Sequence, residues 1–298
     1  MSALHFARPL LAALALLAWL LPGSARAGEF LHIAVTAAVT SQEGLPAYQK
    51  LADYLTQRTG SQNKMIGDLS YRTINAMLRA GAVDVGFICG YPYTELKVRQ
   101  PDLTLLAAPV PVGARYQHRP VYFSELVVNR GSAFQSLDDL RGKRLAFNSD
   151  ISNSGYNMPR FELVERGLTK GFFGSTLQSG AHDDSVKFVA EGRADAAFVD
   201  SLVLDDMLRR KHPAAAQIRI IASLGPAPAP PVVARPGMPL EQRNGLQRAL
   251  LEMDQNPQGR AILAELGIER FVRVSDQDYQ PIRDWARRAK QANFMVIR

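Results

Sequence analysis

The stretch DISNSGYNMPR, residues 150–160, joins an apolar run at 143–147 to a helical pattern at 161–166. The run predicts a strand and the pattern predicts the body of a helix, so Ser152, Asn153 and Ser154 stand at a helix N-terminus. Backbone N–H groups lack internal partners there, and the helix dipole is positive. With hydroxyl and amide donors added, and Gly155 allowing close approach to the backbone, the segment has the chemistry of an anion cradle. An ordinary N-cap uses the same residue types.

Strand and helix patterns alternate on both sides of this stretch. The run LHIAV at 31–35 predicts a strand, and 45–58 predicts a helix with Leu51, Tyr54 and Leu55 at helical spacing. The alternation continues to about residue 221. It predicts an α/β architecture with largely parallel strands.

The N-terminus has the features of a secretory signal peptide. Arg8 precedes an apolar stretch at 9–21, which is followed by PGSARA at 22–27. A basic start, a short apolar core and an A-x-A site predict cleavage after Ala27 and export into a bacterial periplasm. The apolar core is too short for a membrane span. No cysteine stands directly after the cleavage site, so a lipoprotein anchor is not indicated.

Composition limits the remaining functions. Removal of 27 of the 298 residues leaves 271, and the formal charge falls from +7 to +5 because Arg8 and Arg26 leave. A mildly basic protein can favour anions, or the charge can simply keep it soluble. No basic run interleaved with aromatic residues indicates nucleic-acid binding. Cys89 is the single cysteine, which excludes an internal disulfide.

Six short sequence motifs resemble those of the phosphate/phosphite/phosphonate-binding proteins of ABC transporters, a family with arsenite-sensing relatives. The motifs are SLDDLRGKRLAF at 136–147 with SNSGY at 152–156 and Met158-Pro159, GAVDVGF at 81–87, SGAHD at 179–183 and GRADAAFVDS at 192–201. The resemblance spans nearly the whole mature chain. It implies a two-lobed periplasmic binding protein of type II, with the ligand cleft between the lobes.

An internal echo fits two similar lobes. GAVDVGFIC at 81–89 matches GRADAAFVD at 192–200, and each copy follows an amphipathic helical pattern. Such an echo would also arise by chance, or from the helix–turn–strand pattern that many proteins share. Interpreted with the family, it pairs Cys89 with Asp200 at strand ends and Tyr71 with His182 at helix starts. Ligands of open α/β sheets bind at the carboxyl ends of strands, so the echo indicates one inter-lobe cleft.

Lobe boundaries follow from two crossings, near 119–122 and near 224–231. The second crossing contains GPAPAPP at 225–231, which suits neither a helix nor an interior strand. We expect residues 28–120 and 226–298 to form the first lobe and 121–225 the second. Helical patterns at 240–254, 257–266 and 275–292 are expected to pack back onto the first lobe.

The resemblance implies ligand contacts for several polar residues. Tyr71 and Tyr122 match positions whose hydroxyls contact the anion in the family, although each also suits packing. Ser152, Asn153 and Ser154 match its hydroxyl-rich cradle, with Asn153 in place of a commoner threonine. His182 offers one hydrogen bond when neutral and charge when protonated, or serves as a cap.

Asp200 is an acid at an expected anion site, and three roles remain open. It can accept a proton from a protonated oxyanion, orient His182, or cap the helix at 201–209. Family members that bind aminoalkylphosphonates hold the ammonium with acidic groups, where this chain has Leu202 and, more loosely aligned, Pro230. An ammonium-bearing ligand is therefore disfavoured.

Cys89 stands where the family usually has glycine. A buried cysteine is a small hydrophobe in most proteins. The arsenite-sensing relatives rely on a cysteine, so Cys89 as a ligand for a thiophilic species is the alternative. In that alternative the protein signals to a membrane histidine kinase.

Enzyme and metal signals are weak. The chain lacks G-x-S-x-G, H-E-x-x-H, P-loop and C-x-x-C motifs. His182, Asp183 and Asp184 with Cys89 lack the spacing of structural zinc sites. A Cys89–His182 hydrolase, the remote alternative, would need a third orienting group.

The sequence therefore predicts a monomeric periplasmic solute-binding protein without cofactor or catalysis. Its expected ligand is phosphate, phosphite or a simple phosphonate. Its expected partner is an ABC permease, or a membrane sensor kinase, since both read a ligand-closed form.

Overall fold

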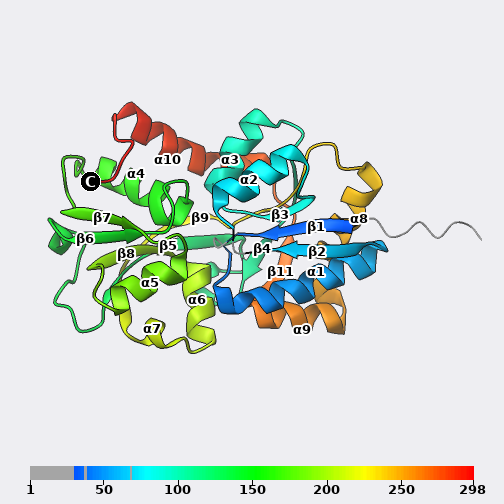
Figure 1. Ribbon diagram of the computed structural model, residues 1–298, viewed down its shortest axis with the longest axis horizontal. Coiled ribbons are helices and arrows are strands. Elements are labelled where there is room, and N and C mark those ends of the chain that lie inside the picture. Colours follow the sequence, from blue (N-terminus) through cyan, green and yellow to red (C-terminus); the bar gives the residue numbers. More distant parts are fainter. Residues whose placement is uncertain (1–29, 37–38, 68) are drawn as a thin grey trace, which may run out of the picture.

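The computed structural model describes residues 30–298 except 37–38 and 68. The predicted signal peptide at 1–27 lies outside the described residues. The chain forms two sheets side by side, each flanked by helices (Figure 1). The α/β two-lobed architecture predicted from the sequence is confirmed.

The first sheet has the strand order β11-β4-β10-β3-β1-β2. Its strands are β1 (Phe30–Val35), β2 (Gln62–Ile66), β3 (Val85–Phe87), β4 (Thr104–Pro111), β10 (Val232–Ala234) and β11 (Ile268–Val272). The helices around it are α1 (Leu45–Thr59), α2 (Tyr71–Ala80), α3 (Gly90–Arg99), α8 (Leu240–Leu251) and α9 (Pro257–Leu266).

The second sheet has the order β7-β6-β8-β5-β9. Its strands are β5 (Val121–Asn129), β6 (Arg144–Phe147), β7 (Ser175–Gln178), β8 (Ala196–Asp200) and β9 (Ile218–Pro228). Helices α4 (Met158–Glu165), α5 (His182–Ala190), α6 (Ser201–Arg209) and α7 (Pro213–Ala216) surround it. The predicted strand at 143–147 and the helix after it are β6 and α4.

Each sheet lies between two hydrophobic layers. In the first lobe, one cluster includes Leu51 of α1 and Leu246 of α8, and another includes Ile74 of α2 and Tyr93 of α3. In the second lobe, Leu163 of α4 belongs to one cluster, whereas residues of α5, α6 and α7 belong to another. The apolar stripes of the helices therefore cover both faces of each sheet.

The two sheets repeat one topology. In the first lobe β1 pairs in parallel with β2 and β3, and in the second lobe β6 pairs in parallel with β7 and β8. Strands β3 and β8 are both followed by a helix, α3 or α6, and both pair on their other side with an antiparallel strand. The echo of 81–89 in 192–200 thus marks equivalent elements.

The expectation of largely parallel strands holds for β1, β2 and β3 and for β6, β7 and β8, but each sheet is mixed. Strands β10, β4 and β11 of the first sheet are joined by antiparallel pairing, as are β8, β5 and β9 of the second. Strands β5 and β10 are the ones that enter a lobe after a crossing. Each inserts next to the central strand, β8 or β3, with its direction reversed.

The second predicted crossing is partly a strand. Strand β9 continues through Pro228, and Pro228 pairs with Val121 of β5. Strand β9 is the edge of its sheet, where the missing N–H of proline breaks no interior ladder. Part of the GPAPAPP run therefore lies in an edge strand. This agrees with the prediction that the run suits no interior strand.

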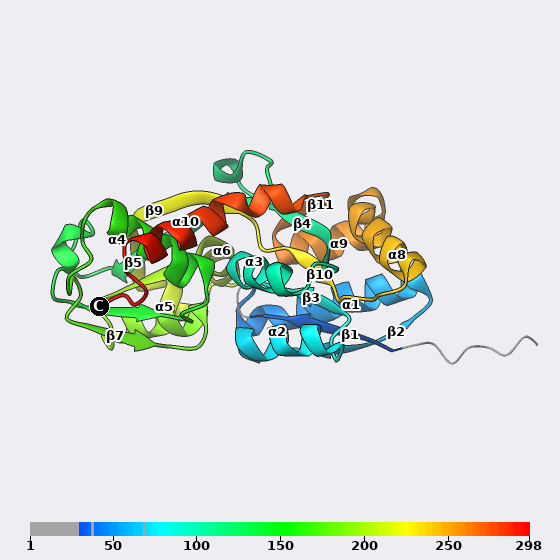
Figure 2. The ribbon, with the colours of Figure 1, turned by 90° about the horizontal axis from the view of Figure 1, so that it is seen from above.

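The C-terminal tail differs from its expected position. Helix α10 (Gln280–Gln291) contacts both α3 and α4, and Figure 2 shows it lying along both lobes. Beyond it, Phe294 and Ile297 are buried in the cluster around Leu163. The tail thus packs onto the first lobe, as expected, and also forms a third link to the second lobe.

Within residues 30–36, 39–67 and 69–298, no helix combines the length and apolar character needed to span a bilayer.

Candidate functional site

Helix N-termini from both lobes meet at one buried cluster. Helices α2 and α5 begin at Tyr71 and His182, and Cys89 and Asp200 are the N-caps of α3 and α6. Ser152 is the N-cap of a π-helical turn, Asn153–Asn157, that continues into α4. All of these residues are buried. Five positive helix ends therefore converge where the sequence predicted an anion cradle.

The π-helical turn gives the cradle its shape. The Ser152 hydroxyl accepts a hydrogen bond from Gly155 N at 3.1 Å, and Asn157 N donates to Ser152 O at 3.0 Å. The wider turn adds one residue before the regular helix begins. Ser152 is thus an N-cap, and the same hydroxyl lies 3.4 Å from His182 Nε2.

Asn153 connects the cradle to Cys89 and Tyr122. Its side-chain amide donates to the Tyr122 hydroxyl at 2.9 Å, where β5 enters the second lobe. Its backbone N–H donates to Cys89 Sγ at 3.3 Å, across to the first lobe. Two predicted residues far apart in sequence are therefore held by one asparagine.

His182 is a neutral hydrogen-bond donor. Asp200 N donates to His182 Nδ1 at 3.3 Å, so in the neutral ring the hydrogen is on Nε2. Nε2 lies 3.4 Å from Ser152 Oγ and from Ser154 Oγ. Burial lowers the pKa of His182 to about 3. The site therefore has an imidazole N–H rather than an imidazolium charge at neutral pH.

Asp200 caps α6 and supports the cradle. One carboxylate oxygen accepts from Leu202 N at 2.9 Å, and the other accepts from the Ser154 hydroxyl at 3.1 Å. Of the three roles left open by the sequence, the cap is confirmed. Orientation of His182 comes from the backbone N–H of Asp200 instead. Burial raises the pKa of this carboxyl well above its usual range.

Cys89 is a buried thiol. Burial raises its pKa to about 12, and its sulfur accepts the Asn153 N–H. It packs with Tyr71, Val39 and Ile151. At neutral pH the sulfur is protonated and weakly nucleophilic.

Asn148 belongs to the cluster, although the sequence analysis did not select it. It directly follows β6, and its Nδ2 donates to the Tyr71 hydroxyl at 2.9 Å. Its Oδ1 is buried without a hydrogen-bond partner among the described residues. Its position at the carboxyl end of a parallel strand was the signal that would have found it.

Gly155 has a different role from the one expected. A Cβ at this position would lie 2.1 Å from Asn148 Oδ1 and 3.2 Å from His182 Cε1. The bare face of Gly155 therefore accommodates the Asn148 amide, in the space that the sequence predicted for ligand approach.

The cluster has no direct cationic partner in the described part of the chain. The nearest guanidinium connected by hydrogen bonds is Arg160, which donates to Asn157 Oδ1 at 3.0 Å, while Asn157 Nδ2 donates to Asn153 Oδ1 at 3.1 Å. Among the described residues, no group of three or more His, Cys, Asp or Glu side chains is arranged to hold a metal ion. An anion here would be bound by dipoles and neutral donors.

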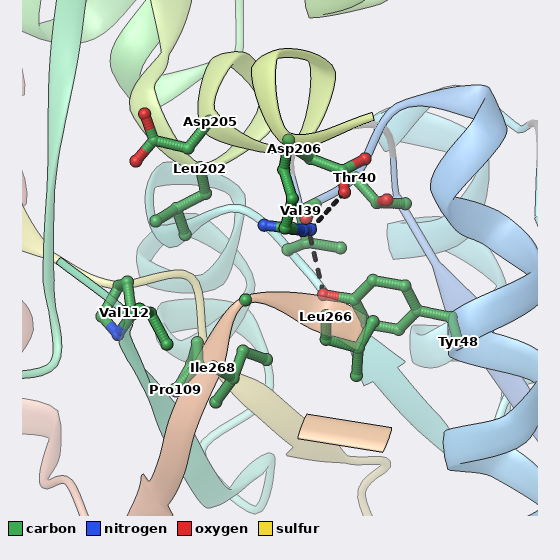
Figure 3. Close-up of a pocket in the computed structure, with 13 residues that line it drawn as sticks. Val39, Thr40, Tyr48, Pro109, Val112, Leu202, Asp205, Asp206, Leu266 and Ile268 are labelled. Carbon is green, nitrogen blue, oxygen red and sulfur yellow. Dashed lines mark hydrogen bonds and ion pairs between the residues drawn. The ribbon is translucent and has the colours of Figure 1, made fainter. Parts of the chain in front are cut away.

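A separate small cavity lies on α6. It has a volume of about 40 Å³, and its lining includes Tyr48, Asp205 and Asp206 together with Ile268 of β11 (Figure 3). None of the eight residues predicted for the site lines it. The geometry of the helix N-termini, rather than this cavity, locates the candidate site.

Two α/β lobes with a polar cluster between them define a periplasmic binding protein of type II. The family model described as "ABC transporter, phosphonate, periplasmic substrate-binding protein" matches residues 33–279. The chain belongs to this family. Family members are substrate-binding components of transporters.

Individual relatives agree with this assignment. The phosphate-import protein PhnD of Mycolicibacterium smegmatis is 26% identical over 59% of this chain and 57% of its own length. The phosphonates-binding periplasmic protein of Escherichia coli is 26% identical over 56% of this chain and 51% of its own. The match thus spans about half the length of these curated relatives.

Solved structures share the fold. A binding protein component of an ABC phosphonate transporter from Pseudomonas aeruginosa has a TM-score of 0.81 at 21% identity, covering 89% of this chain and 88% of that one. PhnD1 from Prochlorococcus marinus in complex with methylphosphonate has a TM-score of 0.78 at 19% identity, covering 88% and 99%.

Proposed function

We propose that the protein captures a small phosphorus oxyanion, namely phosphate, phosphite or a simple phosphonate, for an ABC permease. The observation that carries the proposal is the convergence of five helix N-termini on buried hydroxyl and amide groups. Such N-termini bind anions without a side-chain cation. The residues of the proposed ligand site are Tyr71, Cys89, Tyr122, Ser152, Asn153, Ser154, His182 and Asp200.

Relatives support the ligand class. One curated relative is named for phosphate import, another for phosphonate binding, and a structural neighbour contains methylphosphonate. Leu202 at the start of α6 offers no acid for an ammonium group. We therefore place unsubstituted phosphonates and inorganic phosphorus oxyanions ahead of aminoalkylphosphonates.

The number of donors limits the affinity. Three or four hydrogen bonds to a charged ligand contribute about 1.5–3 kcal/mol each, and about −8 kcal/mol corresponds to micromolar binding. The protein performs no chemistry on its ligand in this proposal. It acts as a periplasmic monomer and transmits binding by closure of the lobes.

A ligand panel tests the proposal. Thermal unfolding is measured with phosphate, phosphite, methylphosphonate, sulfate, arsenate and arsenite, because a ligand that binds only the native state raises the unfolding temperature. A rise with at least one phosphorus oxyanion, confirmed by calorimetry, is expected. If the unfolding temperature does not rise with phosphate, phosphite or methylphosphonate, the proposal is wrong.

The arsenite-sensing alternative depends on Cys89. Its position beside the Asn153 N–H favours a ligand role, whereas its raised pKa opposes thiolate formation. Arsenite binding with transmission to a membrane histidine kinase is therefore the second candidate. A Cys89–His182 hydrolase is not favoured, because Nδ1 of His182 accepts from a backbone N–H and no carboxylate among the described residues hydrogen-bonds to the ring.

A further inference from the structure

Asn148 has an unusual hydrogen-bonding state for a buried amide. The residue has no exposed surface, and Oδ1 lacks a partner among the described residues. Buried polar atoms in native proteins nearly always have a partner, so an orphan acceptor calls for an explanation. The position of this amide favours one explanation, namely that a ligand supplies the missing hydrogen-bond donor.

The amide lies inside the candidate site. Nδ2 is held by the Tyr71 hydroxyl across the lobes at 2.9 Å. Oδ1 occupies the bare face of Gly155, in the first turn of the cradle, next to the ring edge of His182. The free acceptor is therefore surrounded by residues of the second lobe's helix N-termini and fixed by a residue of the first lobe.

We propose that Asn148 is a ligand contact whose Oδ1 accepts a hydrogen bond from a protonated oxygen of the bound oxyanion, so that the site selects the singly charged form. This inference rests on the proposed capture of a phosphorus oxyanion. A phosphonate or phosphate monoanion carries one P–OH group and supplies that hydrogen. A sulfonate or sulfate at neutral pH carries acceptors only, so its oxygen would face Oδ1 without a hydrogen between them.

Asn148 suits this role better than Asp200. Both carboxylate oxygens of Asp200 already accept hydrogen bonds, from Leu202 N and Ser154 Oγ. Asn148 Oδ1 accepts none. A neutral acceptor also avoids repulsion between a carboxylate and the remaining charge of the ligand. Selection against sulfur oxyanions then follows from an unpaired acceptor, which rejects a wrong ligand strongly.

The charges around the amide are few. Tyr71, Tyr122 and Cys89 have raised pKa values because they are buried, and His182 is neutral because burial lowers its pKa. Asp200 is the carboxyl group of the cluster, and burial raises its pKa above its usual range. At the surface, Arg72 pairs with Asp150 at 2.6 Å. A pH experiment must therefore separate Asp200 from the ligand's own ionisation.

Calorimetry on substituted proteins gives the first test. Wild type, Asn148→Leu and Ser149→Ala are titrated with methylphosphonate and methanesulfonate. Ser149 is the matched control, since it is the adjacent buried polar residue and, among the described residues, its hydroxyl has a single hydrogen bond, accepted from Ile151 N at 3.4 Å. Asn148→Leu should lose about tenfold or more in methylphosphonate affinity, with a smaller preference over methanesulfonate, and Ser149→Ala should match wild type. Unchanged affinity and preference in Asn148→Leu would overturn the proposal.

The pH profile of wild type gives a second test that needs no variant. Affinity should fall about tenfold per pH unit above the second ionisation of the ligand, because one proton is lost. The methyl group donates electrons, so methylphosphonate ionises at higher pH than phosphite, and the two profiles should be displaced accordingly. If the pH profiles of the two ligands coincide, the proton belongs to Asp200 and not to the ligand, which would contradict the proposal. If affinity does not change with pH, the site does not select a protonated ligand. If wild type binds neither ligand, the proposed function fails instead.

Discussion

Single hydrogen bonds connect the residues of the candidate site, so single substitutions test it. Asn153→Ala removes the bond to the Tyr122 hydroxyl, Ser152→Ala removes a cap hydroxyl beside His182, and Tyr71→Phe removes the partner of Asn148. Each should weaken methylphosphonate binding about five- to tenfold, the effect of about 1–1.5 kcal/mol, while leaving the protein folded. Calorimetry beside thermal unfolding separates the two effects. Unchanged affinity in all three variants would contradict the cradle.

Cys89 distinguishes the two candidate ligands. If the ligand is a phosphorus oxyanion, the sulfur fills space and accepts the Asn153 N–H, so Cys89→Ser should change phosphite affinity by less than about threefold. If the ligand is arsenite, serine cannot replace a sulfur–arsenic bond. Arsenite and phosphite titrations of both proteins decide the question. Tight arsenite binding that is lost in Cys89→Ser, and in thiol-blocked wild type, would reverse the order of the candidates.

His182 predicts a pH dependence of stability. Its folded pKa of about 3 lies below the unfolded value of about 6.5, so between these values the unfolded state binds more protons. The stabilising contribution of the neutral ring is present above pH 6.5 and is lost as the pH falls towards 3. Asp200, whose pKa is raised, acts in the opposite direction, so wild type alone does not isolate His182.

A comparison of variants isolates the histidine. Urea unfolding of wild type and His182→Gln from pH 7 to pH 4 should show that wild type loses more stability on acidification, with a difference in slope of up to about 1.4 kcal/mol per pH unit. His118→Gln is the control, because His118 is an exposed partner of Glu269. Parallel curves for wild type and His182→Gln would show that the ring is not held neutral.

At the scale of elements, the sequence predicted features that depend on neighbouring residues better than features that depend on strand pairing. Strand ends, helix caps and the echo of 81–89 in 192–200 depend on neighbouring residues. They placed Tyr71 and His182 correctly at helix N-termini, and Cys89 and Asp200 at or just after strand ends. Strand direction depends on long-range pairing, and the reversed direction of β5, β10 and β11 was not predicted. Asn148 was missed because its significance depends on Tyr71, 77 residues away, and on the bare face of Gly155.

Substitution of Gly155 tests the packing between Gly155 and Asn148. A methyl group at position 155 would lie 2.1 Å from Asn148 Oδ1, so Gly155→Ala should lower the free energy of unfolding by about 1–3 kcal/mol. Asn148→Ser removes the obstructing amide, so the double variant should recover part of that loss as a positive coupling. Gly245→Ala in α8 is the control, since its Cβ would meet Thr59 at 3.5 Å and the change should stabilise the helix slightly. Strict additivity of the two changes would argue against contact between positions 148 and 155.

At the scale of the whole molecule, the lobes are joined by more than the two predicted crossings. Helix α10 and the buried residues Phe294 and Ile297 add a third link. Side chains also meet across the lobes, where Ser41 donates to Asp206 at 2.8 Å and Arg72 pairs with Asp150. A rigid-body closure must therefore bend or slide α10 while β5 and β9 act as hinges.

Ligand binding should stabilise this arrangement. Small-angle scattering of wild type should give a smaller radius of gyration with saturating methylphosphonate than without ligand, because the N-termini of both lobes must approach one anion. Equal radii at proven saturation would count against hinge closure.

The Ser41–Asp206 contact tests whether closure and affinity are linked. It is buried, and neither residue belongs to the candidate site, so Ser41→Ala should leave the ligand contacts intact and destabilise only the closed arrangement. Asp206 keeps Arg209 and Arg210 as partners, so no carboxylate is left unpaired. Apparent affinity scales with the population of the closed form, and loss of one hydrogen bond worth about 1 kcal/mol should weaken methylphosphonate binding about fivefold. Thr73→Ala, on the exposed side of α2, is the control. Wild-type affinity in Ser41→Ala, with wild-type scattering, would show that this contact does not contribute to closure.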